Sequence, residues 1–298
     1  MPNPQKVIEI LNRLDFDVKK ISKYSIKQES TYFSLLRAAL LKNFEFNIFI
    51  WKADKKHSFF NTATLRGICE DIIALNFIGN FAEKNRNELV EKLFLLNILE
   101  SCETQANFFK VNKSYQPVLN LNQTNKNTTP AQLKEDIKAI VKKQHPGLQI
   151  KSNGLPSIYK MSEDCGLKEL YDYLYAATSR WVHFSPHILI RMGWDEPEDD
   201  LGSFCKVSTE NFSQYYLDFT RFYATYLFTK FCDVFQEKLD LSKDFIELVE
   251  QLIGLIDDTA RWPEIVTFEE MNRKPPSYQT YALFQVVNSM KDKEREDQ

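Results

Sequence analysis

The sequence is poor in glycine, with only 8 among its 298 residues. Few glycines mean few turns that need a positive φ, which argues against a hairpin-rich β protein. Apolar residues make up 43% of the chain, enough for a sizeable core, and phenylalanine alone contributes 23. Bulky aromatic rings fill the wide gaps between crossing helices. We therefore expect an all-α fold.

Strong net charge and long apolar runs are also absent. The formal net charge is −3, which gives no electrostatic footprint for general nucleic-acid binding, although it leaves room for a local basic groove. No apolar run approaches the roughly 18 residues that a membrane span needs. The N-terminus, Met1–Lys6, lacks the apolar stretch of a signal peptide. We expect a cytoplasmic protein with no membrane partner.

Motifs for cofactors and metals are missing as well. The chain has no Gly-rich phosphate loop, no Gly-x-Ser-x-Gly elbow and no His-Glu-x-x-His pattern. Its five cysteines form no Cys-x-x-Cys pair and most lie in apolar helical patterns, which is typical of reduced core thiols. They are Cys69, Cys102, Cys165, Cys205 and Cys232. We expect no cofactor and no metal site.

Apolar residues recur at helical spacing along most of the chain, which predicts about eight to ten helices around a Phe/Tyr-rich core. A polar, Asn-rich stretch at 112–130 is typical of a surface loop, and 147–163 is expected to be irregular. The predicted helices cover residues 4–20, 28–51, 62–79, 82–105, 130–144, 164–184, 207–238 and 242–257.

We see no internal repeat and no clear domain boundary. The sequence therefore predicts one helical domain over residues 1–298, with its core at roughly 28–257. Residues 106–163 would form a polar loop insertion within this domain. The remaining tail, 258–298, ends in a run of charged side chains.

The predicted helix 62–79 carries two charged side chains one turn apart. Arg66 and Glu70 are spaced i, i+4, which permits a side-chain pair. The residues around them are apolar, so part of this helix is expected to be buried, and a buried arginine needs partners because desolvating it alone costs several kcal/mol. Arg66 is either an anion-binding group oriented by Glu70 or one half of a structural ion pair.

Ser179 and His183 repeat this spacing, with Arg180 beside them and His187 four residues further on. Ser185–Pro186 is typical of the N-cap and first residue of a new helix. His183 would then end one helix, where the dipole favours imidazolium, and His187 would begin the next, where it favours neutral imidazole. Such a pair would suit general acid–base work. The alternative is one core histidine and one surface histidine.

Three short elements together resemble a known family. They are an Arg-x-x-x-Glu helix, a downstream helix with an arginine, and a Tyr-x-x-x-Ser-x-x-x-His element. The residues are Arg66, Glu70, Arg86, Tyr175, Ser179 and His183. Over roughly residues 30–240, they resemble a bacterial helical family known only as a domain of unknown function. That resemblance implies an α-helical fold and no established activity.

The segment from Arg180 to His187 has six residues between the arginine and the histidine. It is distantly similar to the motif of HEPN domains, which include many ribonucleases of toxin–antitoxin, abortive-infection and CRISPR systems. In that family the motif pairs across a homodimer and cleaves RNA without metal, through attack by the 2′-hydroxyl. This chain departs from the usual motif at Trp181 and Pro186.

This resemblance implies a HEPN-like, metal-independent ribonuclease or RNA-acting effector in bacterial stress or phage defence, with a partner protein from such a system. Arg180 would stabilise charge on the phosphate, and His187 would be the general base or acid with His183 as its partner. The supporting residues would be Arg66, Glu70 and Ser179. One alternative is a non-enzymatic adaptor or ligand-sensing module in which these side chains form a buried structural network. Another is a small-anion or nucleotide binder.

Overall fold

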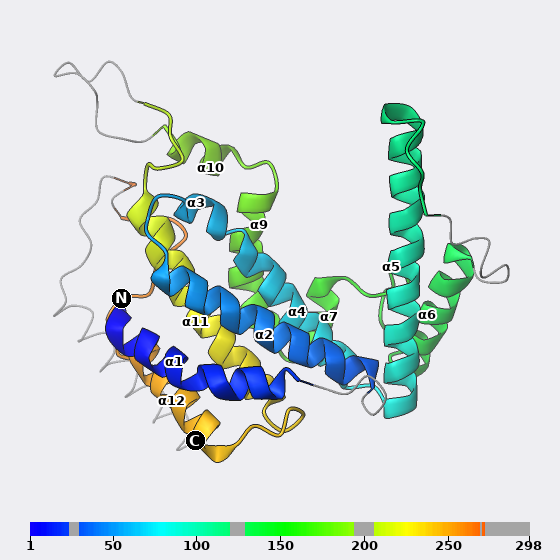
Figure 1. The fold of residues 1–298 in the computed structure, drawn as a ribbon, viewed down its shortest axis with the longest axis horizontal. Coiled ribbons are helices and arrows are strands. Elements are labelled where there is room, and N and C mark those ends of the chain that lie inside the picture. The colour runs from blue at the N-terminus through cyan, green and yellow to red at the C-terminus, as the bar shows by residue number, and fades with distance from the viewer. Residues whose placement is uncertain (24–29, 120–128, 194–205, 269, 272–298) are drawn as a thin grey trace. The chain divides into compact units, whose positions relative to one another are not determined.

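The computed structural model describes residues 1–23, 30–119, 129–193, 206–268, 270 and 271, and its elements over these residues are all helical (Figure 1). The predicted fold class is confirmed. The elements are α1 (Pro4–Ile21), α2 (Thr31–Lys52), α3 (Ser58–Asn61), α4 (Thr64–Gly79), α5 (Glu83–Asn112), α6 (Pro130–Gln144), α7 (Ile158–Asp164), α8 (Lys168–Leu170), the π-helical turn η2 (Tyr171–Tyr175), α9 (Ala176–Val182), α10 (Pro186–Arg191), α11 (Ser213–Phe235) and α12 (Lys243–Asp257).

The chain divides into two compact units. The described residues of Met1–Lys23, Ala39–Cys69 and Tyr173–Gln298 form unit 1, and those of Tyr24–Ala38 and Glu70–Asp172 form unit 2. Helices α2 and α4 each contribute residues to both units. Compact units of this kind can belong to one domain, so the predicted single domain and its boundaries stay a prediction.

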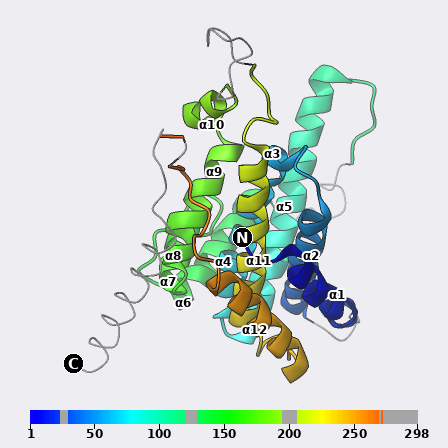
Figure 2. The same cartoon turned by 90° about the vertical axis from the view of Figure 1, so that its left-hand side faces the viewer.

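The core of unit 1 is centred on α11. Helices α3 and α12 pack against α11, and α1 packs against α12 (Figures 1 and 2). Both α1 and α12 bury apolar residues three and four positions apart, so each contributes one apolar stripe. The predicted aromatic core is confirmed. Its fully buried rings on α11 are Tyr216, Phe219, Phe222, Phe228, Phe231 and Phe235.

Buried polar side chains fix how α2 lies against α11 within unit 1. Nδ2 of Asn47 donates to a backbone carbonyl of α11 at 3.0 Å. Nε1 of Trp51 donates to Oγ1 of Thr225 at 2.8 Å. The guanidinium of Arg221 donates to three backbone carbonyls at the end of α2. Because a buried polar group without a partner is costly, these bonds favour one register of the two helices.

In unit 2, α5 and α6 lie side by side (Figure 1). Nζ of Lys92 lies 2.9 Å from a carboxylate oxygen of Asp136, and Nζ of Lys134 lies 2.8 Å from one of Glu100. Helix α6 begins as predicted, since Thr129 is its N-cap and proline is its first residue. Helix α5 runs to Asn112, past the predicted end at residue 105.

Other predicted segments also differ from the structure, among them the helix expected at 207–238, which begins at Ser213 and ends at Phe235. Part of the stretch 147–163 is helical, because Ser157 caps α7 by accepting from the backbone N–H of Lys160 at 3.2 Å. The predicted helix 164–184 begins only at α8, because Gly166 takes a φ of 71° and turns the chain. The middle of the Asn-rich loop, 120–128, and the charged end of the tail lie outside the described residues.

The cysteines within the described residues are free thiols. Cys69 and Cys232 are buried, whereas Cys102 and Cys165 are half-buried. Burial raises the pKa of the Cys232 thiol well above its ordinary value. The fifth, Cys205, lies outside the described residues.

Every helix in the described part of the chain is too short or too polar to cross a bilayer.

Candidate functional site

Helices α9 and α10 and their connection line an open hollow of about 380 Å³ in unit 1. Four of the six predicted site residues line it, namely Ser179, Arg180, His183 and His187. The side chains of Arg180 and His183 are exposed, whereas Ser179 and His187 are half-buried. The structure therefore brings the predicted Arg, Ser and His side chains together in one place.

The hollow is created by a break between two short helices. Helix α9 ends at Val182, and His183 follows in an extended conformation with φ −106° and ψ 163°. Ser185 takes the N-cap position of α10 and Pro186 is its first residue, as predicted, although the serine hydroxyl makes no capping bond. Because the chain turns at this break, His183 and His187 line the same hollow from two different helix ends.

Arg66 of α4 orients His183. Its Nη1 lies 2.6 Å from Nε2 of His183, and its Nη2 donates to the hydroxyl of Tyr175 at 3.0 Å. The guanidinium also lies over the Tyr175 ring, 5.0 Å from the ring centre. Arginine has no acceptor, so Nε2 of His183 accepts and its proton is assigned to Nδ1. The supporting role of Arg66 stays a prediction.

His183 follows the last residue of α9, the helix end at which imidazolium was expected. The expected charge of His183 stays a prediction. The predicted partner of Arg66, Glu70, lies one turn further along α4, half-buried and among the residues of unit 2.

His187 faces a different arginine. Nη2 of Arg191 lies 3.4 Å from Nε2 of His187, and Oε1 of Glu270 lies 3.7 Å from the same nitrogen. Burial lowers the pKa of His187, and the positive charges of Arg191 and Arg180 lower it further, while Glu270 opposes them. The expectation that His187 is neutral at physiological pH agrees with this direction.

No sequence pattern predicted Arg191 and Glu270 as site residues. Both side chains are fully buried, and Nε of Arg191 donates to Oε1 of Glu270. The guanidinium also donates to the carbonyl of Ile265 at 2.8 Å and lies 4.8 Å from the ring centre of Tyr215. The i, i+4 spacing from His187 to Arg191 was an available signal. Glu270 had no such sequence signal, because it lies 79 positions from Arg191, in a tail that was predicted to be charged.

Trp181 of α9 packs against the aromatic core. Its ring packs against Tyr216 and Phe219 of α11, with centroid distances of 6.1 and 5.7 Å. The side chain therefore anchors α9 to the aromatic core instead of facing the hollow. The neighbouring Arg180 is exposed, since adjacent residues of a helix point about 100° apart.

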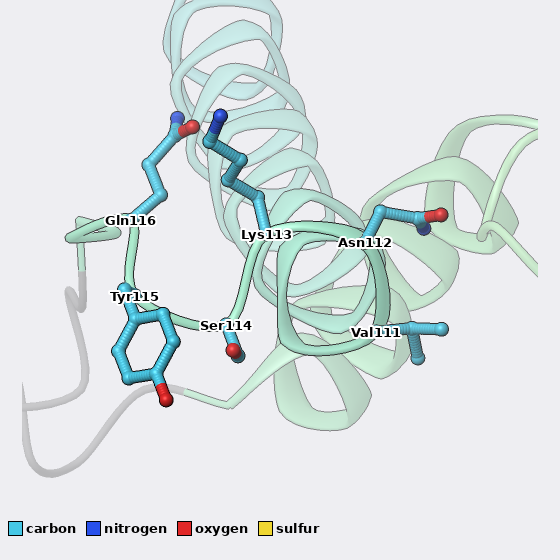
Figure 3. Close-up of a pocket in the computed structure, with 6 residues that line it drawn as sticks. All are labelled: Val111, Asn112, Lys113, Ser114, Tyr115 and Gln116. Carbon is cyan, nitrogen blue, oxygen red and sulfur yellow. The ribbon is translucent and has the colours of Figure 1, made fainter.

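A second hollow, of about 490 Å³, lies at the end of α5 in unit 2. Consecutive residues from Val111 to Gln116 line it, and their side chains point in different directions (Figure 3). Lys113 is the single charged side chain among them. Without converging polar groups this hollow offers no site for chemistry, in contrast to the hollow between α9 and α10.

Comparison with known proteins adds one finding. Residues 61–200 match a family of unknown function, DUF5677. The predicted likeness to a family without known function is confirmed over this span, which contains Arg66 and the whole hollow between α9 and α10. No curated protein and no solved structure matches the chain. The likeness to HEPN domains stays a prediction.

The chemistry of the hollow suits an anion. One guanidinium and two imidazoles line it, and a second guanidinium contacts one of the imidazoles. Arginine binds phosphate oxygens through paired N–H donors, and a neutral histidine can donate one hydrogen bond or accept a proton. Among the described residues, no group of three or more His, Cys, Asp or Glu side chains is arranged to hold a metal ion.

Proposed function

We propose that the chain is a HEPN-like ribonuclease or related RNA-acting effector, and that the hollow between α9 and α10 binds a phosphodiester of RNA. The observation that supports this proposal is the convergence of Arg180, His183 and His187 on one open hollow. An open site admits a flexible single strand more easily than a rigid duplex, because a single strand can bend and splay its bases. The proposed substrate is therefore single-stranded RNA.

In the proposed reaction, Arg180 binds the non-bridging oxygens of the scissile phosphate. His183, whose Nε2 is held by Arg66, donates a hydrogen bond from Nδ1 to the same phosphate. His187 takes the proton of the 2′-hydroxyl while O2′ attacks phosphorus and the bond from phosphorus to O5′ breaks. The leaving O5′ takes a proton from solvent. The products are a 2′,3′-cyclic phosphate and a 5′-hydroxyl end.

His187 has to turn before it can act as the base, because its Nε2 faces Arg191 in the ligand-free chain. Catalytic hydrogen bonds are often incomplete without substrate.

The contact between Nε2 of His187 and Arg191 also favours a second candidate function. Both imidazoles accept from arginines at Nε2, at 2.6 Å for His183 and 3.4 Å for His187. Histidines fixed in this way also suit a non-enzymatic adaptor or sensor that binds an anionic ligand without cleaving it.

The experiment is incubation of the purified chain with end-labelled single-stranded RNA and with DNA of the same sequence. Cleavage of RNA alone, leaving cyclic phosphate ends, is the expected result. Arg180→Ala and His187→Ala should each lower the rate by about 10²-fold or more without lowering the melting temperature. The matched controls are Arg13→Ala and His57→Ala, at exposed positions outside the hollow.

Other outcomes of this experiment would support a different function or a different site. Binding of RNA without cleavage, lost in Arg180→Ala, would favour the sensor or adaptor. Cleavage that survives in both hollow variants would contradict the proposed site. Expression in bacteria gives a parallel readout, since growth arrest with fragmented total RNA should require Arg180 and His187. A homodimer, and a partner protein from a defence or toxin–antitoxin system, belong to the same proposal.

A further inference from the structure

The segment that follows α12 is tied to α11 and α10 at several points. The hydroxyl of Tyr223 donates to the carbonyl of Pro263 at 2.6 Å, and that of Tyr215 donates to the carbonyl of Glu264 at 2.8 Å. Trp262 packs on Phe222, with ring centres 5.1 Å apart. These anchors hold the segment over α11 and bring its last described turn to Arg191.

Glu270 is fixed by both of its carboxylate oxygens. Oε1 accepts from Nε of Arg191, and Oε2 accepts from the backbone N–H of Thr267 at 2.7 Å. Oγ1 of Thr267 in turn accepts from the backbone N–H of Glu270 at 3.2 Å, so the two residues cap each other reciprocally. The carboxylate has little freedom to move, and it points at an arginine that contacts His187.

A buried ion pair of this kind contributes little to stability compared with apolar residues of the same size, because desolvation offsets the attraction. The presence of this ion pair therefore needs an explanation other than stability, and the adjacent His187 provides one. Arg191 and Glu270 both lie within 4 Å of Nε2 of His187, at 3.4 and 3.7 Å. Opposite charges at such distances act directly on the charge of an imidazole.

We propose that Arg191 and Glu270 are positioning residues that set the charge and the ring orientation of His187. Arg191 donates to Nε2, which places the ring proton on Nδ1 and disfavours the imidazolium. Glu270 holds Arg191 in place and partly offsets its charge. The segment after α12 thus belongs to the site, although it lies outside the family match at 61–200. The inference rests on the proposed role of His187.

Several charged and titratable groups surround His187. His183 and Arg180 line the same hollow, and Arg191 and Glu270 contact the ring. From α11, the rings of Tyr215 and Tyr216 face Arg191 at 4.8 and 5.9 Å. Of the two groups that contact the ring, Arg191 lowers the pKa of His187 and Glu270 raises it, so their removal should move its titration in opposite directions.

Nuclear magnetic resonance tests the inference without any RNA, because the chain has only 4 histidines to assign. In the wild type, His187 should carry its proton on Nδ1 and titrate below the ordinary histidine range. Arg191→Met should raise the pKa of His187, since Glu270 then faces it alone. Glu270→Gln should lower that pKa, since Arg191 is no longer offset. Arg191→Lys keeps the charge and should lose the tautomer preference.

Tyr223→Phe is the matched control. It loosens the same segment by removing the bond to Pro263, so it should lower the melting temperature and leave the titration of His187 unchanged. Folded Arg191→Met and Glu270→Gln chains in which His187 titrates as in the wild type would overturn the inference. If Arg191→Met does not fold, Glu270→Gln and Arg191→Lys decide the question.

RNA cleavage separates this inference from the proposed function. If both hold, the acidic limb of the pH–rate profile should move with the pKa of His187 in each variant. If the titrations shift as expected but the wild type cleaves no RNA, the ribonuclease proposal fails and the positioning of His187 stands. If RNA is cleaved and the titrations do not shift, the positioning role fails and the ribonuclease proposal stands.

Discussion

Nη1 of Arg66 on α4 lies 2.6 Å from Nε2 of His183 at the end of α9. The contact joins residues 117 positions apart and decides which nitrogen of the imidazole carries the proton. Tyr175 supports it from one turn before Ser179, by accepting from the same guanidinium at 3.0 Å. Arg66 therefore acts on the hollow through His183, without lining it.

The first prediction concerns this pair. Arg66→Ala and His183→Ala should each reduce RNA cleavage, or RNA affinity if the chain only binds, by about 10²-fold. The double variant should be hardly worse than either single variant, because both changes remove the same oriented imidazole. The expected coupling energy is about 1–3 kcal/mol. Cleavage rates and titrations of binding for the four chains measure it.

Arg13→Ala controls for the loss of one positive charge at an exposed position. It should lower affinity slightly through long-range electrostatics and show no coupling with His183→Ala. Additive effects of Arg66→Ala and His183→Ala would mean that Arg66 contacts the RNA by itself. Such a result would remove the orienting role that the 2.6 Å contact indicates.

The sequence predicted those parts of the site that depend on local rules. The break at Ser185–Pro186 follows from capping chemistry, and the structure places the new helix there. The π-helical turn Tyr171–Tyr175 was not predicted, because a single turn with i→i+5 hydrogen bonds has no sequence pattern that separates it from an α-helix. That turn directly precedes α9 and so affects which way its side chains face.

The tertiary contacts of the site could not be read in the same way. Arg66 was a candidate because a charged residue in an apolar helix needs a partner, but no local pattern identified His183 as that partner. Glu270 was overlooked because a charged residue near a chain end is usually solvated. Only the fold shows that its side chain is fully buried against Arg191.

A second prediction concerns Gly154 in unit 2. This residue has a φ of 87°, and a Cβ built on it would lie 2.8 Å from the backbone carbonyl oxygen of Lys134 on α6. Gly154→Ala should therefore destabilise the protein by about 2–4 kcal/mol, combining left-handed strain with overpacking. Urea unfolding measures the change. Gly147→Ala is the matched control, because nothing lies within 4 Å of its added Cβ.

Gly147→Ala should be neutral or slightly stabilising, since alanine reduces the freedom of the unfolded chain. Equal stability of Gly154→Ala and Gly147→Ala would contradict the close approach of this loop to α6. Loss of stability in both would instead indicate that the whole connection after α6 tolerates no side chain.

A third prediction is the pH dependence of stability. The pKa of His187 is lowered from its ordinary value of 6.5, mainly by burial and then by Arg191. The unfolded chain therefore binds a proton near pH 6.5 at this position, while the folded chain does not until lower pH. The contribution to folding is complete above pH 7 and is lost as pH falls below about 6.5.

His187→Gln should remove this pH dependence, because glutamine stays neutral at every pH. The urea midpoint of the wild type should fall more steeply between pH 7 and 5 than that of His187→Gln. His57→Gln, at an exposed histidine, should keep the wild-type slope. A slope that is the same in all three chains would show that His187 is not held neutral by the fold.

The last prediction concerns the surface beside the hollow. Val182, Leu189 and Ile190 are 51%, 52% and 56% exposed and lie on α9 and α10. Exposed apolar side chains on the elements that carry a candidate site are typical of a protein–protein interface. If two hollows pair in the proposed homodimer, Leu189→Asp and Ile190→Asp should each weaken self-association in sedimentation experiments, because a carboxylate is costly to bury.

Phe16→Asp is the control for this experiment, since Phe16 is 74% exposed on α1 and distant in sequence from the hollow. It should leave the oligomeric state unchanged. RNA cleavage should fall in parallel with dimer content in the two hollow-side variants, because each would still contain intact Arg180 and His187. A wild-type monomer that cleaves RNA would show that one copy of the hollow is sufficient and that the apolar surface serves another partner.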